Sequence, residues 1–177
     1  MIRREFGLWT TGPDRESGGN LKGMTKVILV LAVVLVGCAP ARSAPASQPT
    51  ESRWASVLHR LDERREHAYV QADPSLFDQV YVRGSPVRGA DVRLLRSYVR
   101  RGLELEAVPM HLRDVEVIAQ SDRRVRLRVV DRLGVVRVRH ADGPWRALPT
   151  DRPTKRIITL RRGVDGWRIA EIRRVAG

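Results

Sequence analysis

In the segment 52–73, apolar and charged residues follow the period of a helix. Between Ser52 and Asp73 the apolar residues recur every three, four or seven positions, and charged residues occupy the others. This spacing predicts a helix of about 18 residues that begins at Ser52 or Arg53 and ends at the Asp73-Pro74 step, where Asp73 fits a helix cap. Its apolar side comprises Trp54, Val57, Leu58, Leu61, Ala68 and Tyr69.

Two shorter helices are predicted next. One begins at Pro74, since proline is favoured in the first turn of a helix, and the segment 83–86 breaks it. Another runs from Ala90 to Arg101, with Gly102 as its stop.

Beyond Gly102 the period changes to two, which predicts strands. The alternating segments are 103–107, 115–119, 125–129 and 136–139, the last after a bulge or turn at Gly134. Residues 140–153 are rich in Pro, Gly and Asp and predict a loop. Residues 157–161 and 167–172 then predict a hairpin across the turn 162–166.

Helices followed by antiparallel strands predict an α+β fold with the helices on one face of a curved sheet. The order of elements resembles the nuclear transport factor 2-like (NTF2-like) superfamily, which includes ketosteroid isomerase and the SnoaL-like cyclases. The matching pieces are AYVQADPSLFDQVY (68–81) and DGWRIAEI (165–172). The resemblance implies a cone of three N-terminal helices packed on a curved antiparallel sheet over residues 53–177. A lipocalin-like or cystatin-like curved sheet is the alternative.

A short apolar run precedes this domain. The ten apolar residues Val27–Val36 follow Lys26, a length typical of the apolar part of a signal peptide, whereas a membrane-spanning helix needs about 20. The run ends in Leu35, Val36, Gly37 and Cys38, which resembles the lipobox of bacterial lipoproteins.

The lipobox resemblance implies cleavage before Cys38, lipidation of its thiol and amino group, palmitate among the acyl chains, and a position on the outer face of the cell membrane. Cys38 is the only cysteine, so no intramolecular disulfide competes for it. Two alternatives stay open: a secreted protein cleaved near Ala41, Ala44 or Ala46, and an uncleaved anchor.

The segments on either side of the signal lack apolar periodicity. Residues 1–23 predict no folded element, and the compact start at Met24 suggests that they are a start-site artefact, with residues 24–37 as the signal peptide. Residues 38–52, the lipidated cysteine and a stretch of mainly Ala, Pro, Ser and Thr, predict a tether. Residues 53–177 then form one domain.

The chain is strongly basic, with a net charge of +13. Such an exported domain is attracted to anionic lipid or wall polymer, and export excludes a nucleic-acid function in the cell. The predicted anion-binding face lies on two strands and comprises Arg124, Arg126, Arg128, Arg137 and Arg139.

An isomerase-type site needs a carboxylate base in an apolar pocket and an acid near the developing oxyanion. The candidates are Tyr69, Asp73, Tyr81, Tyr98, His111, Asp114 and Asp131. The tyrosines take apolar helical positions, which favours a core role, and Asp131 beside Arg132 fits a solvated ion pair. We therefore predict no catalytic residue.

Other kinds of site find little support. His59 and His67 lie eight residues apart, which is too far for shared metal coordination on a helix, and no glycine-rich phosphate loop is present. We predict no metal and no cofactor. The predicted pocket residues are Tyr69, Tyr81, Tyr98 and Trp145, the last as an anchor for a ligand or partner.

The favoured interpretation is a membrane-anchored lipoprotein presenting a non-catalytic binding domain for an envelope protein or an apolar small ligand. The alternatives are an isomerase or cyclase-type enzyme and a basic accessory protein that binds anionic envelope polymer or lipid. Homodimer formation is compatible with all three.

Overall fold

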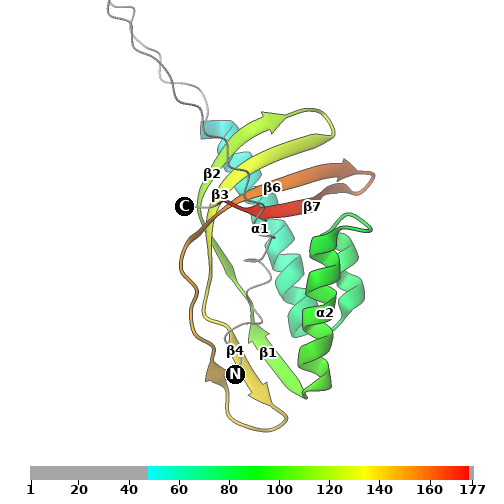
Figure 1. Cartoon of the computed structure of the whole chain (residues 1–177), viewed down its shortest axis with the longest axis vertical. Coiled ribbons are helices and arrows are strands. Elements are labelled where there is room, and N and C mark those ends of the chain that lie inside the picture. The colour runs from blue at the N-terminus through cyan, green and yellow to red at the C-terminus, as the bar shows by residue number, and fades with distance from the viewer. Residues whose placement is uncertain (1–47, 176–177) are drawn as a thin grey trace, which may run out of the picture.

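Helices come first along the chain and strands follow, in a computed structural model that describes residues 48–175 (Figure 1). The helical elements are α1 (Gln48–Val70), the 3-10 helix η2 (Pro74–Gln79) and α2 (Pro86–Arg100). The strands are β1 (Leu103–Ala107), β2 (Met110–Gln120), β3 (Arg124–Leu133), β4 (Arg137–His140), β5 (Arg146–Ala147), β6 (Thr154–Gly163) and β7 (Gly166–Arg174).

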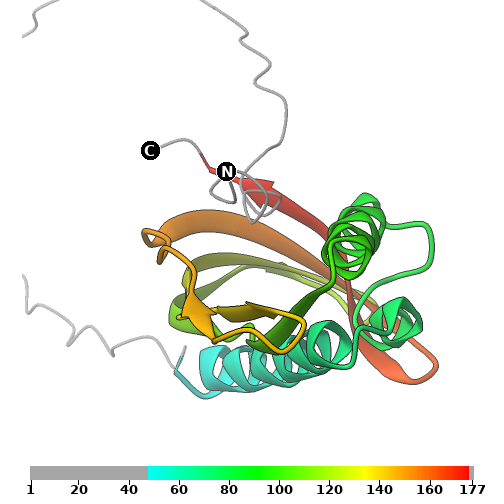
Figure 2. The same cartoon turned by 90° about the horizontal axis from the view of Figure 1, so that it is seen from below.

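The strands form two antiparallel sheets. The larger has the order β2-β3-β6-β7 and the smaller the order β1-β4-β5. The larger sheet curves over α1, which lies along β2, whereas η2 and α2 lie toward its β7 edge (Figure 2). The predicted α+β architecture, with three N-terminal helical segments on a curved antiparallel sheet, is confirmed. This is the architecture that the resemblance to the NTF2-like superfamily implies.

Two helices start earlier than the apolar pattern predicts. Helix α1 begins at Gln48, so the last residues of the predicted tether segment are helical, and α2 begins at Pro86 rather than at Ala90. Both helices have a proline in the first turn, where a missing N–H costs nothing. The first turn of a helix needs no apolar residue, so periodicity alone places the start too late.

The core lies between the helices and the inner face of the larger sheet. On β3 the alternate residues Val125, Leu127 and Val129 are fully buried, as the period of two predicts. They pack with the apolar side of α1, and every buried residue of the core cluster lies between Trp54 and Ile169. The segment 48–177 therefore contains the whole of this core.

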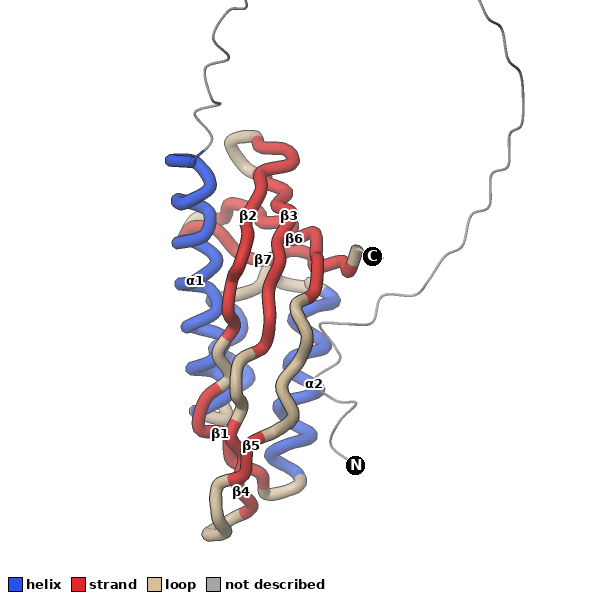
Figure 3. The backbone as a smooth tube through the Cα atoms, turned by 90° about the vertical axis from the view of Figure 1, so that its left-hand side faces the viewer, coloured by secondary structure: helices blue, strands red, loops and turns tan. Residues whose placement is uncertain are grey.

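Trp54 fixes the beginning of α1 to the sheet. Its ring nitrogen donates a hydrogen bond of 3.0 Å to the side-chain oxygen of Gln120, at the end of β2. Its ring also meets that of Trp167, at the start of β7, edge to face with centroids 4.9 Å apart. The beginning of α1 therefore lies at the same end of the molecule as the β2–β3 and β6–β7 turns (Figure 3).

The segment between η2 and α2 pairs with the free edge of β7. Val82 donates its backbone N–H to the carbonyl oxygen of Ile169, whose N–H bonds to the carbonyl of Val80. The hydroxyl of Ser85 donates to the carbonyl oxygen of Ala170. These bonds position α2 against the sheet.

The predicted signal peptide, the lipobox Leu35-Val36-Gly37 and the lipidation site Cys38 lie outside the described residues. Within residues 48–175, no helix is long and apolar enough to cross a membrane.

Candidate functional site

A cavity of about 280 Å³ lies between α1 and the inner face of the larger sheet. Six apolar side chains line it: Leu58, Leu61, Met110, Leu112, Ile158 and Ile169. Its polar lining comprises His59, Asp62, Arg65, His111 and Asp131. The cavity thus combines an apolar wall with a small set of charged groups.

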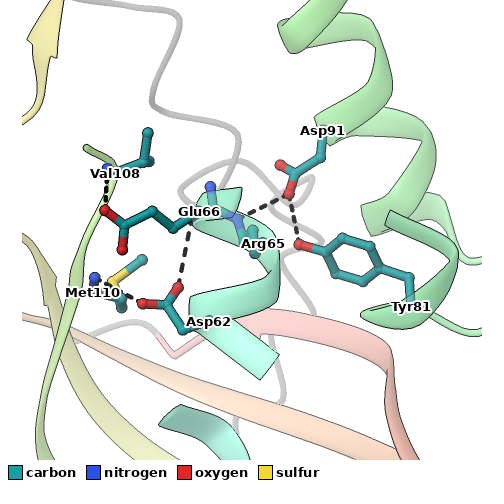
Figure 4. A network of polar contacts seen from close by, with 7 residues as sticks. All are labelled: Asp62, Arg65, Glu66, Tyr81, Asp91, Val108 and Met110. Carbon is teal, nitrogen blue, oxygen red and sulfur yellow. Dashed lines mark hydrogen bonds and ion pairs between the residues drawn. The ribbon is translucent and has the colours of Figure 1, made fainter. Parts of the chain in front are cut away.

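Asp62 enters the cavity from α1. Its carboxylate accepts a hydrogen bond of 2.8 Å from the backbone N–H of Met110, at the start of β2. One turn further along the helix, Glu66 accepts a bond of 3.1 Å from the N–H of Val108. Helical spacing places the two carboxylates on the face of α1 that meets the β1–β2 connection, so they hold this connection in place (Figure 4).

Burial is the main cause that raises the pKa of Asp62, to about 6. The guanidinium of Arg65, 3.8 Å away, and the hydrogen bond from Met110 act in the opposite direction but do not cancel it. Asp62 therefore exchanges its proton close to neutral pH.

Arg65 continues the network away from the cavity. Its Nε lies 2.9 Å from a carboxylate oxygen of Asp91, which also accepts a hydrogen bond of 2.6 Å from the hydroxyl of Tyr81 (Figure 4). All three side chains are about 1% exposed. The ring of Tyr69 lies 4.9 Å from the Arg65 guanidinium. Burial and the nearby Asp91 raise the pKa of both tyrosines well above their usual range, so they stay neutral.

A second buried pair joins β3 and β6. Asp131 and Arg156 lie 3.1 Å apart, and each is about 1% exposed. Burial is the main cause that raises the pKa of Asp131 to about 6; Arg156 acts in the opposite direction, and the charge of Asp62 acts in the same direction as burial. Burial also lowers the pKa of Arg156. Asp62 and Asp131 are the two acidic groups that line the cavity.

Two carboxyls that titrate near pH 6 in an apolar cavity can do two things. When ionised, they accept hydrogen bonds from a hydroxyl or an amine. Because their pKa values are close to neutral, they can also give or take a proton. Within the described residues, no cluster of His, Cys, Asp or Glu is arranged to hold a metal ion.

The cavity is not lined by the four predicted pocket residues. Tyr69, Tyr81 and Tyr98 are fully buried in the core, as expected for apolar helical positions. Trp145 is half-buried, and the guanidinium of Arg139 lies 4.8 Å from the centroid of its ring. A tyrosine on the apolar side of a helix packs in the core as a leucine does. Here these core positions do not line the cavity.

The other acid and base candidates are dispersed. Asp73 caps η2 by accepting a hydrogen bond of 2.8 Å from the N–H of Ser75, as predicted. Asp114 is exposed, and His111, also exposed, lies at the edge of the cavity. Asp131 is in an ion pair, but the expected solvated pair with Arg132 is wrong: its partner is Arg156, and the pair is buried.

Sequence reasoning missed Asp62, Arg65, Asp91 and Arg156. A signal for two of them was present. Arg65 lies four residues after Leu61, on the apolar side of the helix, and Arg156 continues the inward alternation of Ile158 and Leu160. A charge at a position where the period calls for an apolar residue is the mark of a buried polar site.

Several solved structures are similar to this chain. The intermembrane space region of the chloroplast protein ARC6 matches with a TM-score of 0.51 and 10% identity, covering 72% of this chain and 97% of that chain. An NTF2-like superfamily protein from Salmonella enterica has a TM-score of 0.45 and 11% identity, covering 71% and 92%. An NTF2-like protein with a cystatin-like fold from Novosphingobium aromaticivorans has a TM-score of 0.39 and 18% identity, covering 76% of this chain and 90% of that chain.

These are similarities of fold. Of the three, the ARC6 region alone exceeds a TM-score of 0.5, and at 10% identity it bears on the architecture and not on the function. No protein-family model and no curated protein matches the sequence. The function must therefore be argued from the cavity.

Proposed function

We propose that the chain is an exported lipoprotein, anchored through Cys38, whose cone binds a small and largely apolar molecule with one polar end. The anchor rests on the apolar run and lipobox-like residues of the sequence. The binding role rests on the cavity.

The observation that carries the binding role is the composition of the cavity wall. Six apolar side chains surround about 280 Å³ of space, and Asp62 and Asp131 are acidic groups in the same wall. Small-molecule sites typically have this form, with a mainly apolar lining and a few convergent polar groups that orient the ligand. The volume favours a small ligand over a protein segment, so an envelope protein partner is the less favoured occupant.

The charges suggest what the polar end of the ligand contains. Arg156 pairs with Asp131 and Arg65 with Asp91, so Asp62 is the carboxyl with the weakest ion pairing, 3.8 Å from Arg65. An ionised carboxylate only accepts hydrogen bonds. We therefore expect the ligand to present a hydroxyl or amine to Asp62.

Native mass spectrometry of segment 48–177, purified gently, tests the binding role. We expect a mass above that of the polypeptide, from a molecule retained in the cavity. Leu112→Trp, which adds bulk to a half-buried residue of the wall, should remove the added mass. Val99→Trp, at an exposed position of α2, is the control and should retain it. An empty wild-type chain, or equal retention in both variants, would contradict the proposal.

The anchor is tested on the full chain in a bacterial host fed a clickable palmitate analogue. We expect the label and the membrane fraction to be lost in Cys38→Ser, because serine provides no thiol for the lipid. Labelling that persists in Cys38→Ser would refute the anchor and leave the binding role untouched.

A second candidate function is acid–base catalysis. The observation in its favour is the pKa of about 6 for both cavity carboxyls, which suits proton transfer near neutral pH. If the domain is an enzyme, the molecule recovered from Asp62→Asn will be a substrate whose mass or structure differs from that recovered with the wild type. Identical molecules in both would favour simple binding.

A further inference from the structure

The arginine face predicted from the sequence is largely neutralised in the structure. Arg128 is paired with Glu116, Arg137 with Glu106, and Arg139 with Glu104, each across neighbouring strands. Such exposed pairs contribute little to stability, but they occupy these guanidinium groups. Anion binding is therefore expected at arginines other than these three.

Within the described residues, Arg124 of the predicted face has no such partner, and it meets two further arginines at a groove of about 290 Å³ on the outer side of the larger sheet. Arg83 comes from the segment before α2, Arg124 from the start of β3, and Arg161 from β6. All three are exposed, and within residues 48–175 none of them forms an ion pair. Arg124 and Arg161 adjoin the inward-facing Val125 and Leu160, so their side chains point away from the core.

The register of the strands concentrates this charge. Arg124 lies directly opposite Arg161 in the pairing of β3 with β6, and like charges in that position are destabilising. The groove has one carboxylate in its lining, that of Glu171, and Arg173 lies 2.8 Å from it. An anion in the groove would offset the repulsion between the arginines.

The groove lies close to the end of the domain from which the anchor would extend. β3 begins at Arg124 immediately after the β2–β3 turn, and Arg161 lies near the β6–β7 turn. Trp54 holds the beginning of α1 at this same end (Figure 1). The nine residues between Cys38 and Gln48 span at most about 30 Å when extended, so lipidation of Cys38 would keep this end near the bilayer.

We propose that Arg83, Arg124 and Arg161 bind the phosphate groups of anionic phospholipids in the membrane that holds the anchor. The orientation toward the bilayer rests on the proposed lipidation, whereas the phosphate chemistry of the groove does not. Guanidinium groups match phosphate oxygens in geometry and charge, and basic residues near an anionic surface add to its affinity.

Vesicle sedimentation with segment 48–177 tests the proposal without the anchor. The vesicles are phosphatidylcholine with about a quarter phosphatidylglycerol, and pure phosphatidylcholine vesicles are the neutral control. The triple variant R83Q/R124Q/R161Q should bind about 100-fold more weakly, at roughly fivefold per arginine. The matched triple R128Q/R137Q/R139Q loses the same net charge from paired positions and should weaken binding by less than about fivefold.

Each other outcome overturns the proposal. Equal losses in the two triples would mean that net charge alone attracts the domain. Equal binding to neutral vesicles would exclude phosphate recognition by charge. Binding of inorganic phosphate, abolished in the first triple, without any binding to vesicles would identify a soluble-phosphate site. Because segment 48–177 lacks Cys38, a failure here is distinct from a failure of the anchor, which the palmitate experiment reports.

Discussion

Asp131 and Arg156 are charged side chains that are almost completely withdrawn from water. Removing two charges from water costs several kcal/mol per ion, and their attraction repays this only in part. An apolar pair of similar size would stabilise the domain at least as well. The pair is therefore better explained by the cavity that it borders than by stability.

This explanation predicts a contrast between a single and a double variant. Arg156→Met leaves Asp131 buried without its partner and should lower the free energy of unfolding by about 3–5 kcal/mol. The double variant Asp131→Leu/Arg156→Met removes both charges and should remain within about 2 kcal/mol of the wild type. Denaturant unfolding at pH 8 measures both values. If both variants lost the same free energy of unfolding, the cost of Arg156→Met would not come from leaving the Asp131 carboxylate buried without its partner.

At the scale of elements, periodicity predicts which faces of the helices and strands pack in the core, but not which charged residues are buried among them. The apolar side of α1 and the inward face of β3 follow their periods, so helix, sheet and core could be predicted from the sequence. Arg65 and Arg156 lie at inward-facing positions of the same periods, but they are charged rather than apolar. Because charged residues are usually exposed to solvent, these two arginines were not predicted to be buried, and the site was missed. The period shows toward which side a side chain points, but not whether an oppositely charged residue lies there.

Pairing between elements was also beyond the sequence pattern. The alternation of arginine and apolar residues on β3 correctly gave an outward basic face. It could not show that Glu116 lies opposite Arg128, or that Arg124 lies opposite Arg161. Strand register decides these pairings, and register depends on bulges such as those in β2.

At the scale of the whole molecule, the cone separates two regions. The cavity lies between α1 and the inner face of the larger sheet, and the arginine groove lies on the outer face near the turn end. A ligand in the cavity and a membrane at the groove would therefore not compete for the same surface. The cone's fold could be predicted from element order, whereas this division depends on side-chain packing across the sheet.

The central claim is that Asp62 and Asp131 are carboxyls of a ligand cavity whose pKa is raised by burial, and the free energy of unfolding of segment 48–177 between pH 4 and 7 tests it most directly. A carboxyl whose pKa is about 6 in the fold and 3.8 when unfolded binds more protons in the folded state between these values. The wild type should therefore lose stability as the pH rises from 4 to 6, by at most about 3 kcal/mol for each carboxyl.

The double variant Asp62→Asn/Asp131→Asn should gain stability relative to the wild type over the same interval, because neither amide titrates. Asp114→Asn, at an exposed position of β2, controls for the loss of a negative charge. A difference between the double variant and the wild type that grows from pH 4 to pH 6 and is constant above pH 7 is the predicted result. Parallel curves would mean that both carboxyls are solvated, and would contradict the account of the cavity.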